Sequence, residues 1–224
     1  MSGMLASVEN LAEALLVLEA GADIIDLKSP SAGALGALPL ATVRDIVQVL
    51  VGRRPVSATI GDMPMHPQSV VRAVESMAAT GVDYVKIGFF PDGDWRSTVV
   101  GLSPLAAQGI RLVAVLFGDL SPSLGQVTEL AAAGFSAAML DTMDKHGGSL
   151  TEVCSLDYLR AFVAETKAQG MLCGLAGSLR PADIPVLANC QADYLGFRGA
   201  LCLGRDRTAG LDTESVRAIR RLLG

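Results

Sequence analysis

One pattern repeats along the 224-residue chain: a helical stretch ends at a glycine, and a short apolar run follows within a few residues. Glycine accepts the left-handed conformation at a helix C-terminus, so the pattern predicts helices that alternate with strands. Each run is followed by a plausible helix, as parallel strands require. Eight runs are predicted strands, at about residues 4–8, 22–28, 55–62, 84–90, 112–119, 137–142, 172–179 and 192–199. The sequence therefore predicts a single (β/α)8, or TIM, barrel domain over residues 1–224.

An open, doubly wound sheet is the alternative architecture. It is disfavoured because no G-x-G-x-x-G motif lies between an early strand and its helix. The chain also accommodates eight strand and helix units, whereas an open sheet of this type has five or six.

Composition narrows the classes of function. Half of the residues are hydrophobic and 18% are charged, which suits strands that are buried on both faces. The net charge of −5 and the lack of a Lys/Arg cluster argue against a nucleic acid or membrane partner. Four cysteines without C-x-x-C spacing and two histidines predict neither a zinc site nor a disulfide framework. We expect a cytoplasmic protein that takes a small-molecule substrate and binds no metal or cofactor. The sequence leaves open whether it forms a homo-oligomer.

Charged residues occur within the predicted second strand. Side chains alternate between the two faces of a strand, so Asp26 and Lys28 share one face, while Ile25 and Leu27 share the other. If the apolar pair packs against helices, the charged pair points into the barrel near the carboxyl end of the strand. Barrel enzymes place catalytic groups there. A purely structural ion pair is the alternative.

Two further segments bring charge to the same end of the barrel. Lys86 faces inward from the fourth strand, and Asp141 and Lys145 follow the sixth. Clustered cations and partial desolvation disfavour an ammonium ion, so one lysine can become a neutral nucleophile. Such an amine attacks a carbonyl to form a Schiff base, and neighbouring acids and bases then move protons. We expect Lys28 to be that nucleophile.

The last two strands end in small residues, where barrels of this type often bind phosphate. Backbone N–H groups of Gly177, Ser178, Gly199 and Ala200 are candidates to hold the anion, and Arg198 could add charge. Glycines in such turns also occur for conformational reasons alone.

Other polar residues near the predicted mouth are harder to assign. Arg205 and Arg207 could reach a second phosphate or a neighbouring subunit, or form a solvated loop. Asp62 and Asp119 could line the mouth or cap a helix or turn. His146 receives no role. Cys173 and Cys202 are expected to be packing residues.

The motifs together resemble the (5-formylfuran-3-yl)methyl phosphate synthase family over nearly the whole chain. The segments that match are DIIDLKSPSAGALGA, PVSATIGD, YVKIGF, DTMDKHG, GLAGSL and GFRGALC, of which DLKSPSAGALGA is the most specific. The resemblance implies a metal-independent lyase that behaves like a class I aldolase. It joins two glyceraldehyde 3-phosphate molecules, closes a furan ring, and loses water and one phosphate, for methanofuran biosynthesis. The resemblance also implies that Lys28 is the Schiff-base lysine and that Asp26, Lys86, Asp141 and Lys145 are the acids and bases around it.

Two other functions compete with this interpretation. One is another Schiff-base triose- or sugar-phosphate aldolase or isomerase on the same barrel, which would give a non-aromatic product. The other is a binding or scaffold protein on a decayed barrel, in which a Lys28→Ala change alters stability and not turnover.

Overall fold

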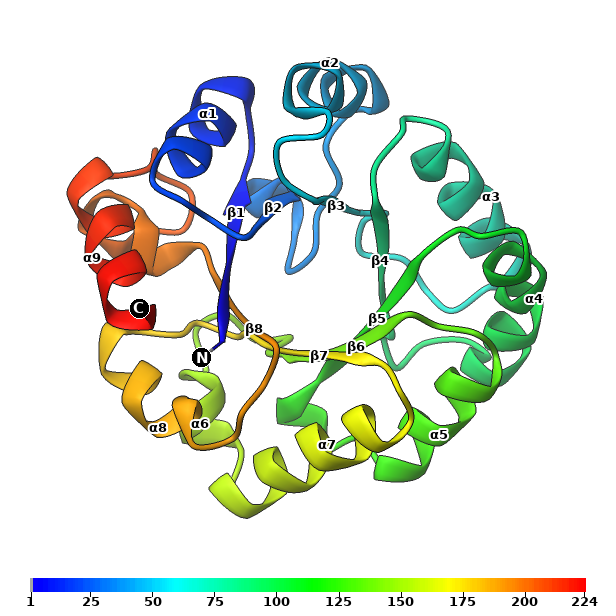
Figure 1. The fold of residues 1–224 in the computed structure, drawn as a ribbon. Helices are drawn as coiled ribbons and strands as arrows, with labels where there is room; N and C mark the ends of the chain where they lie inside the picture. The colour runs from blue at the N-terminus through cyan, green and yellow to red at the C-terminus, as the bar shows by residue number, and fades with distance from the viewer. Residues whose placement is uncertain (1) are drawn as a thin grey trace.

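Eight parallel strands close into a barrel in the computed structural model, which describes residues 2–224, and the helices surround them (Figure 1). The sheet order follows the chain from β1 to β8, and β8 pairs with β1. The strands are β1 Gly3–Val8, β2 Ile24–Leu27, β3 Val56–Thr59, β4 Tyr84–Gly88, β5 Leu112–Phe117, β6 Ala137–Asp141, β7 Leu172–Leu175 and β8 Tyr194–Phe197. The predicted TIM barrel is confirmed.

The helices lie outside the barrel, between successive strands. They are α1 Leu11–Glu19, α2 Leu40–Leu50, α3 Pro67–Ala78, α4 Trp95–Ala107, α5 Leu124–Ala132, α6 Leu150–Val153, α7 Leu156–Ala168, α8 Ile184–Ala188 and α9 Thr213–Leu223. No helix within residues 2–224 combines the length and the apolar character that a bilayer crossing requires.

The glycines that end the helical stretches adopt the conformation that the pattern predicted. Each has a φ between 74° and 93°, in the left-handed region that glycine enters without a Cβ clash. They are Gly21, Gly81, Gly109, Gly134 and Gly170. The repeated glycine therefore marks where the chain turns from the helix layer back to the barrel.

Several strands are shorter than predicted, because apolar and small residues continue past the last ladder pair. β2 ends at Leu27 rather than Lys28, and β7 ends at Leu175 although the apolar run continues to Leu179. Lys28 therefore lies just beyond the strand, where its backbone N–H still donates to the Val8 carbonyl at 3.0 Å. The catalytic candidates lie at strand ends and in the loops that follow them.

Strand register divides the barrel interior into a polar and an apolar part. Ser7 and Ser57 pair with Asp26 from the two neighbouring strands, and Thr59 pairs with Lys86. The other side of the barrel is filled by apolar side chains, including Val113, Val115, Phe117, Met139 and Ala176. Most buried polar side chains of the strands therefore lie on β1 to β4, and Asp141 adds one on β6.

Candidate active site

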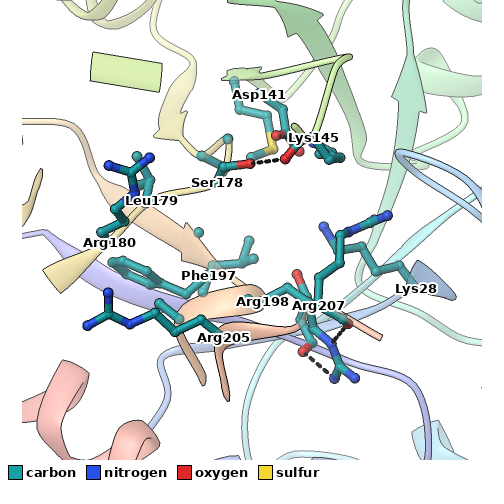
Figure 2. Close-up of a pocket in the computed structure, with 18 of the residues that line it drawn as sticks. Lys28, Asp141, Lys145, Ser178, Leu179, Arg180, Phe197, Arg198, Arg205 and Arg207 are labelled. Carbon is teal, nitrogen blue, oxygen red and sulfur yellow. Dashed lines mark hydrogen bonds and ion pairs between the residues drawn. The ribbon is translucent and has the colours of Figure 1, made fainter. Parts of the chain in front are cut away.

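A cavity of about 340 Å³ opens at the carboxyl ends of the strands (Figure 2). Residues on or just after β1, β2, β4, β6, β7 and β8 line it. Ligand sites of barrel enzymes lie at this face, and the volume is within the range of small-molecule sites. Lys28, Lys86, Asp141 and Lys145 all line the cavity, so the predicted charged residues converge there. Asp26 lies beside Lys86, fully buried.

Asp26 is the centre of a buried hydrogen-bond network. Its carboxylate accepts from Ser7 Oγ at 2.9 Å, from Ser57 Oγ at 2.7 Å and from Lys86 Nζ at 3.0 Å. Burial raises the pKa of Asp26, but the positive charges of Lys86 and Lys28 and the hydrogen bond from Ser57 outweigh it, so the pKa is lowered. Asp26 is thus an anion that holds the Lys86 ammonium in place.

Asp141 and Lys145 form the second pair. Lys145 Nζ donates to Asp141 Oδ1 at 2.6 Å and also to the Thr142 carbonyl, while the Thr142 N–H donates to Asp141 at 2.7 Å. Burial opposes ionisation of Asp141, yet the charges of Lys145 and Lys28 lower its pKa to about 2. The short loop after β6 therefore delivers an ion pair, joined across four residues, to the cavity wall.

Lys28 differs from both of the other lysines. Its Nζ makes no hydrogen bond or ion pair with any residue from 2 to 224, although its side chain is buried and lines the cavity. Burial lowers the pKa of Lys28 to about 8; Asp141 counteracts the shift and Lys145 adds to it. Lys28 therefore provides an amine that is substantially neutral at mildly alkaline pH and has no partner to displace.

The residues predicted to bind phosphate lie in the loops after β7 and β8, and this part of the cavity wall is called the phosphate corner below. Gly177, Ser178, Gly199 and Ala200 line the cavity, and their backbone N–H groups donate to no acceptor among residues 2–224. Gly177 has a φ of 111°, and a Cβ there would lie 2.8 Å from the backbone N of Thr142, so only glycine fits. Unpaired N–H groups at a cavity wall are suited to an anion.

Arg198 lines the cavity, as the prediction requires, but its side chain is not free to add charge at a phosphate. Its guanidinium is buried, and all five of its N–H groups have acceptors: the Glu13 carboxylate twice, and the carbonyls of Ser7, Arg207 and Ala209. Its backbone turns at φ −133°, ψ −69° just after β8. The side chain therefore ties β8 to α1, leaving no free donor for a phosphate.

Three arginines that line the cavity remain to supply charge. Arg180 pairs with Glu152, Arg207 donates to the carbonyls of Pro30 and Gly33, and Arg205 makes no side-chain hydrogen bond within residues 2–224. In the view of Figure 2, Arg180 and Arg205 lie at one end of the pocket, and Lys28 and Arg207 lie at the other. Because Lys86 and Lys145 are paired with Asp26 and Asp141, these arginines supply the excess positive charge of the cavity, which favours a negatively charged substrate.

The structure also shows where the polar residues without an assigned role lie. Asp62 accepts the N–H groups of Ala34 and Leu35, and Asp119 accepts those of Met143 and Asp144, so each carboxylate holds a neighbouring loop and neither lines the cavity. His146 is exposed at the cavity.

The cysteines expected to be packing residues are buried. Burial raises the pKa of Cys173 to about 12 and of Cys202 to about 11, so both are poor nucleophiles.

Sequence reasoning missed Ser7 and Ser57 as partners of Asp26. The only signal in the sequence was that each serine is a polar residue within an apolar run. The contacts themselves could not be predicted, because they depend on the register of three strands.

Comparisons with known proteins place these features in context. The family model described as 4-HFC-P synthase matches residues 4–220. A Methylorubrum extorquens protein, provisionally named (5-formylfuran-3-yl)methyl phosphate synthase, is 45% identical over 222 residues, covering 97% of this chain and 91% of its own. The (5-formylfuran-3-yl)methyl phosphate synthase of Methanocaldococcus jannaschii is 34% identical over 232 residues, covering 98% of each chain.

Solved structures agree on the fold. A 3-hexulose-6-phosphate synthase from Salmonella typhimurium has a TM-score of 0.71 and 16% identity, covering 99% of this chain and 98% of its own. A phosphoribosyl anthranilate isomerase from Thermotoga maritima has a TM-score of 0.71 and 14% identity, covering 100% and 98%. At these identities the likeness extends to the barrel and not to the reaction.

Proposed function

The chain belongs to the 4-HFC-P synthase family, and on that premise we propose that it is a (5-formylfuran-3-yl)methyl phosphate synthase acting in methanofuran biosynthesis. The proposed substrate is glyceraldehyde 3-phosphate, taken twice. Two molecules of this triose lose one phosphate and two waters to give the furan, so the reaction needs no oxidant or reductant. The enzyme is thus a carbon–oxygen lyase that behaves like a class I aldolase.

One observation supports this proposal most: Lys28 feels the charges of two lysine–aspartate pairs, while its own amine has no hydrogen-bond or ion-pair partner among residues 2–224. An imine-forming lysine must be neutral when it attacks, and burial favours the neutral form here. The paired lysines stay beside it as charged groups that can give and take protons. A structural ion pair would instead leave Lys28 bonded to a carboxylate.

The proposed sequence of steps begins when Lys28 Nζ attacks the carbonyl of one triose phosphate. The resulting carbinolamine loses water to give an iminium ion, and a proton leaves the adjacent carbon to form an enamine. The enamine attacks the aldehyde of the second triose, forming the new carbon–carbon bond. Ring closure, elimination of phosphate and water, and release from Lys28 then produce the aromatic ring.

Proton transfers outnumber the carbon-bond steps, which gives the neighbouring residues their proposed roles. Lys145 and Asp141 are a hydrogen-bonded acid and base pair that serves dehydration and elimination. Lys86, held by Asp26, also supplies positive charge and protons. Because these ammonium groups supply charge and protons, we propose that the reaction needs no metal.

The phosphate corner anchors one of the two substrates in this proposal. The N–H groups of Gly177, Ser178, Gly199 and Ala200 bind its phosphate, and the nearby Arg180 and Arg205 supply the charge that the sequence had assigned to Arg198.

The proposal is tested by incubating the purified protein with glyceraldehyde 3-phosphate and following furan-aldehyde absorbance, released phosphate and product mass. We expect a furan monophosphate and one phosphate released per product, in the presence of a chelator, and no product from Lys28→Met. Consumption of the triose into a non-aromatic product would favour the alternative, another Schiff-base aldolase or isomerase. No consumption by the folded protein would overturn both.

A further inference from the structure

The loop between β2 and α2, residues 29–39, folds back on itself beside Lys28. The Ser29 N–H donates to the Gly36 carbonyl at 2.7 Å, and a Cβ on Gly36 would lie 2.4 Å from the Ser29 carbonyl oxygen. In Figure 1 the blue loop after β2 reaches from the ring of strands toward the barrel axis. This β2–α2 loop is therefore compact and crosses part of the barrel mouth.

Leu35 is the residue by which the β2–α2 loop enters the barrel. Its side chain is 1% exposed and packs into the interior apolar cluster with Phe117. A Cβ on Gly88 would lie 2.6 Å from Leu35 Cδ1, so a larger residue at this position of β4 would force the Leu35 side chain to move. The loop therefore covers the ends of β4 and β5, and none of residues 29–39 lines the cavity that holds Lys28.

Asp62, just after β3, holds one side of the β2–α2 loop. Its Oδ2 accepts the Ala34 N–H at 2.8 Å, and its Oδ1 accepts the Leu35 N–H at 2.7 Å. Thr59 adds a hydrogen bond of 3.0 Å from Oγ1 to the Gly36 carbonyl. Two carboxylate oxygens on successive N–H groups fix both the position and the direction of the backbone.

Arg207, in the loop after β8, holds the other side. One terminal nitrogen donates to the Pro30 carbonyl at 2.8 Å, and the other donates to the Gly33 carbonyl at 2.9 Å. Burial lowers the pKa of Arg207, and the negative charges of Asp141 and Asp62 counteract that shift. The two carbonyls match the rigid fork of a guanidinium, which a lysine ammonium cannot reproduce.

Arg207 also adjoins the phosphate corner. Its backbone carbonyl accepts from Arg198 Nε at 2.9 Å, and its Cβ would be 3.8 Å from a Cβ on Gly199. The residue therefore connects the β8 loop to the loop that follows Lys28.

We propose that Arg207 and Asp62 are positioning residues, which clamp the β2–α2 loop from opposite sides and keep it closed over the part of the barrel mouth beside Lys28. This inference rests on the proposed function, since it assigns the clamp to the same imine-forming site. Neither residue touches the reacting atoms in this account; both act through the loop. Closure keeps water from Lys28, whose amine is neutral largely because it is buried.

The test compares Arg207→Met, Arg207→Lys, Asp62→Ala and Asp62→Asn with the wild type. Arg96→Met is the matched control, because Arg96 is an exposed arginine that pairs with Glu129 away from the cavity. Hydrogen exchange of residues 29–39 is measured in the ligand-free protein, together with the melting temperature. Borohydride trapping of glyceraldehyde 3-phosphate on Lys28 is then measured as a function of pH.

Arg207→Met and Asp62→Ala should each speed exchange of the loop at least about tenfold, since each removes two hydrogen bonds, with little change in melting temperature. The midpoint of trapping should move up from about 8 toward the ordinary lysine value of 10.5, as water reaches Lys28 among Asp26, Lys86, Asp141 and Lys145. Arg207→Lys and Asp62→Asn should show smaller effects. The effect of the double variant Arg207→Met/Asp62→Ala on loop exchange and on the trapping midpoint should be smaller than the sum of the two single effects, because both residues act on one loop.

Unchanged loop exchange in both Arg207→Met and Asp62→Ala overturns the clamp, as does faster exchange with an unmoved trapping midpoint. Global unfolding of Asp62→Ala leaves Asp62→Asn and the Arg207 variants to decide it. If the folded wild type traps no triose on Lys28, the proposed function fails, whereas the exchange rates still decide whether the loop is clamped.

Discussion

Lys86 Nζ lies 3.0 Å from Asp26 Oδ1, and neither side chain is more than 2% exposed. Asp26→Asn would leave the Lys86 ammonium buried without its anion. We expect the free energy of unfolding to fall by about 3 kcal/mol and turnover to be lost. Urea denaturation and the furan assay measure the two effects. The double variant Asp26→Asn/Lys86→Met should recover most of the stability without recovering turnover; a stable Asp26→Asn with normal turnover would contradict the assignment.

Lys28 should reduce the stability of the fold at neutral pH. Its pKa is about 8 when folded and 10.5 ordinarily, so the folded state disfavours the proton by about 3 kcal/mol. The unfolded chain binds more protons between these two values, so wild-type stability rises with pH across that window. Lys28→Met should therefore be more stable than wild type at pH 7. The difference in stability should shrink to near zero when the pH exceeds the ordinary lysine pKa. Denaturation of both proteins at several pH values tests this, and a stability gain of Lys28→Met that does not depend on pH would contradict it.

Arg198 should matter for stability rather than for substrate affinity, because its partner Glu13 is buried with it. Glu13→Gln removes that charge and should lower the free energy of unfolding by about 3 kcal/mol, with KM for the triose nearly unchanged at low temperature. Glu19→Gln, on the exposed side of the same helix, is the control. A raised KM with unchanged stability would return Arg198 to the phosphate site.

The phosphate corner should be sensitive to a single methyl group at Gly199. A Cβ there would meet only the Arg205 carbonyl at 3.4 Å and Arg207 Cβ at 3.8 Å, so the fold should tolerate Gly199→Ala. The methyl group crowds the N–H groups proposed to bind phosphate, so KM should rise about tenfold or more. Gly125→Ala, at an exposed site in α5, should leave KM unchanged. An unchanged KM in Gly199→Ala would place the phosphate elsewhere.

The fold could be predicted because its signal is local and repeated. A glycine such as Gly81 or Gly134 ends its helix through its own backbone freedom, and the next strand follows within a few residues. Strand alternation similarly placed Asp26 on an inward face, where the structure has it. Both inferences need only the neighbouring residues in the chain.

Contacts between distant segments could not be predicted in the same way. Arg198 was expected to add charge to the phosphate site, yet its acceptor Glu13 is 185 residues away and meets it only when β8 pairs with β1. Arg207 meets Gly33 across 174 residues. Whether a cation binds a carboxylate therefore depends on how barrel closure brings distant residues together. For the same reason, the sequence alone could not show that Lys86 and Lys145 have carboxylate partners and that Lys28 has none among residues 2–224.

The most direct measurement is the site of the borohydride-reduced adduct with glyceraldehyde 3-phosphate, mapped by peptide mass spectrometry over a range of pH. We expect one adduct, on the peptide that contains Lys28, with a trapping rate that rises to a midpoint near 8. Lys86→Met and Lys145→Met should trap more slowly and at the same residue. An active preparation that forms no adduct, or forms it on Lys86 or Lys145, would contradict the account.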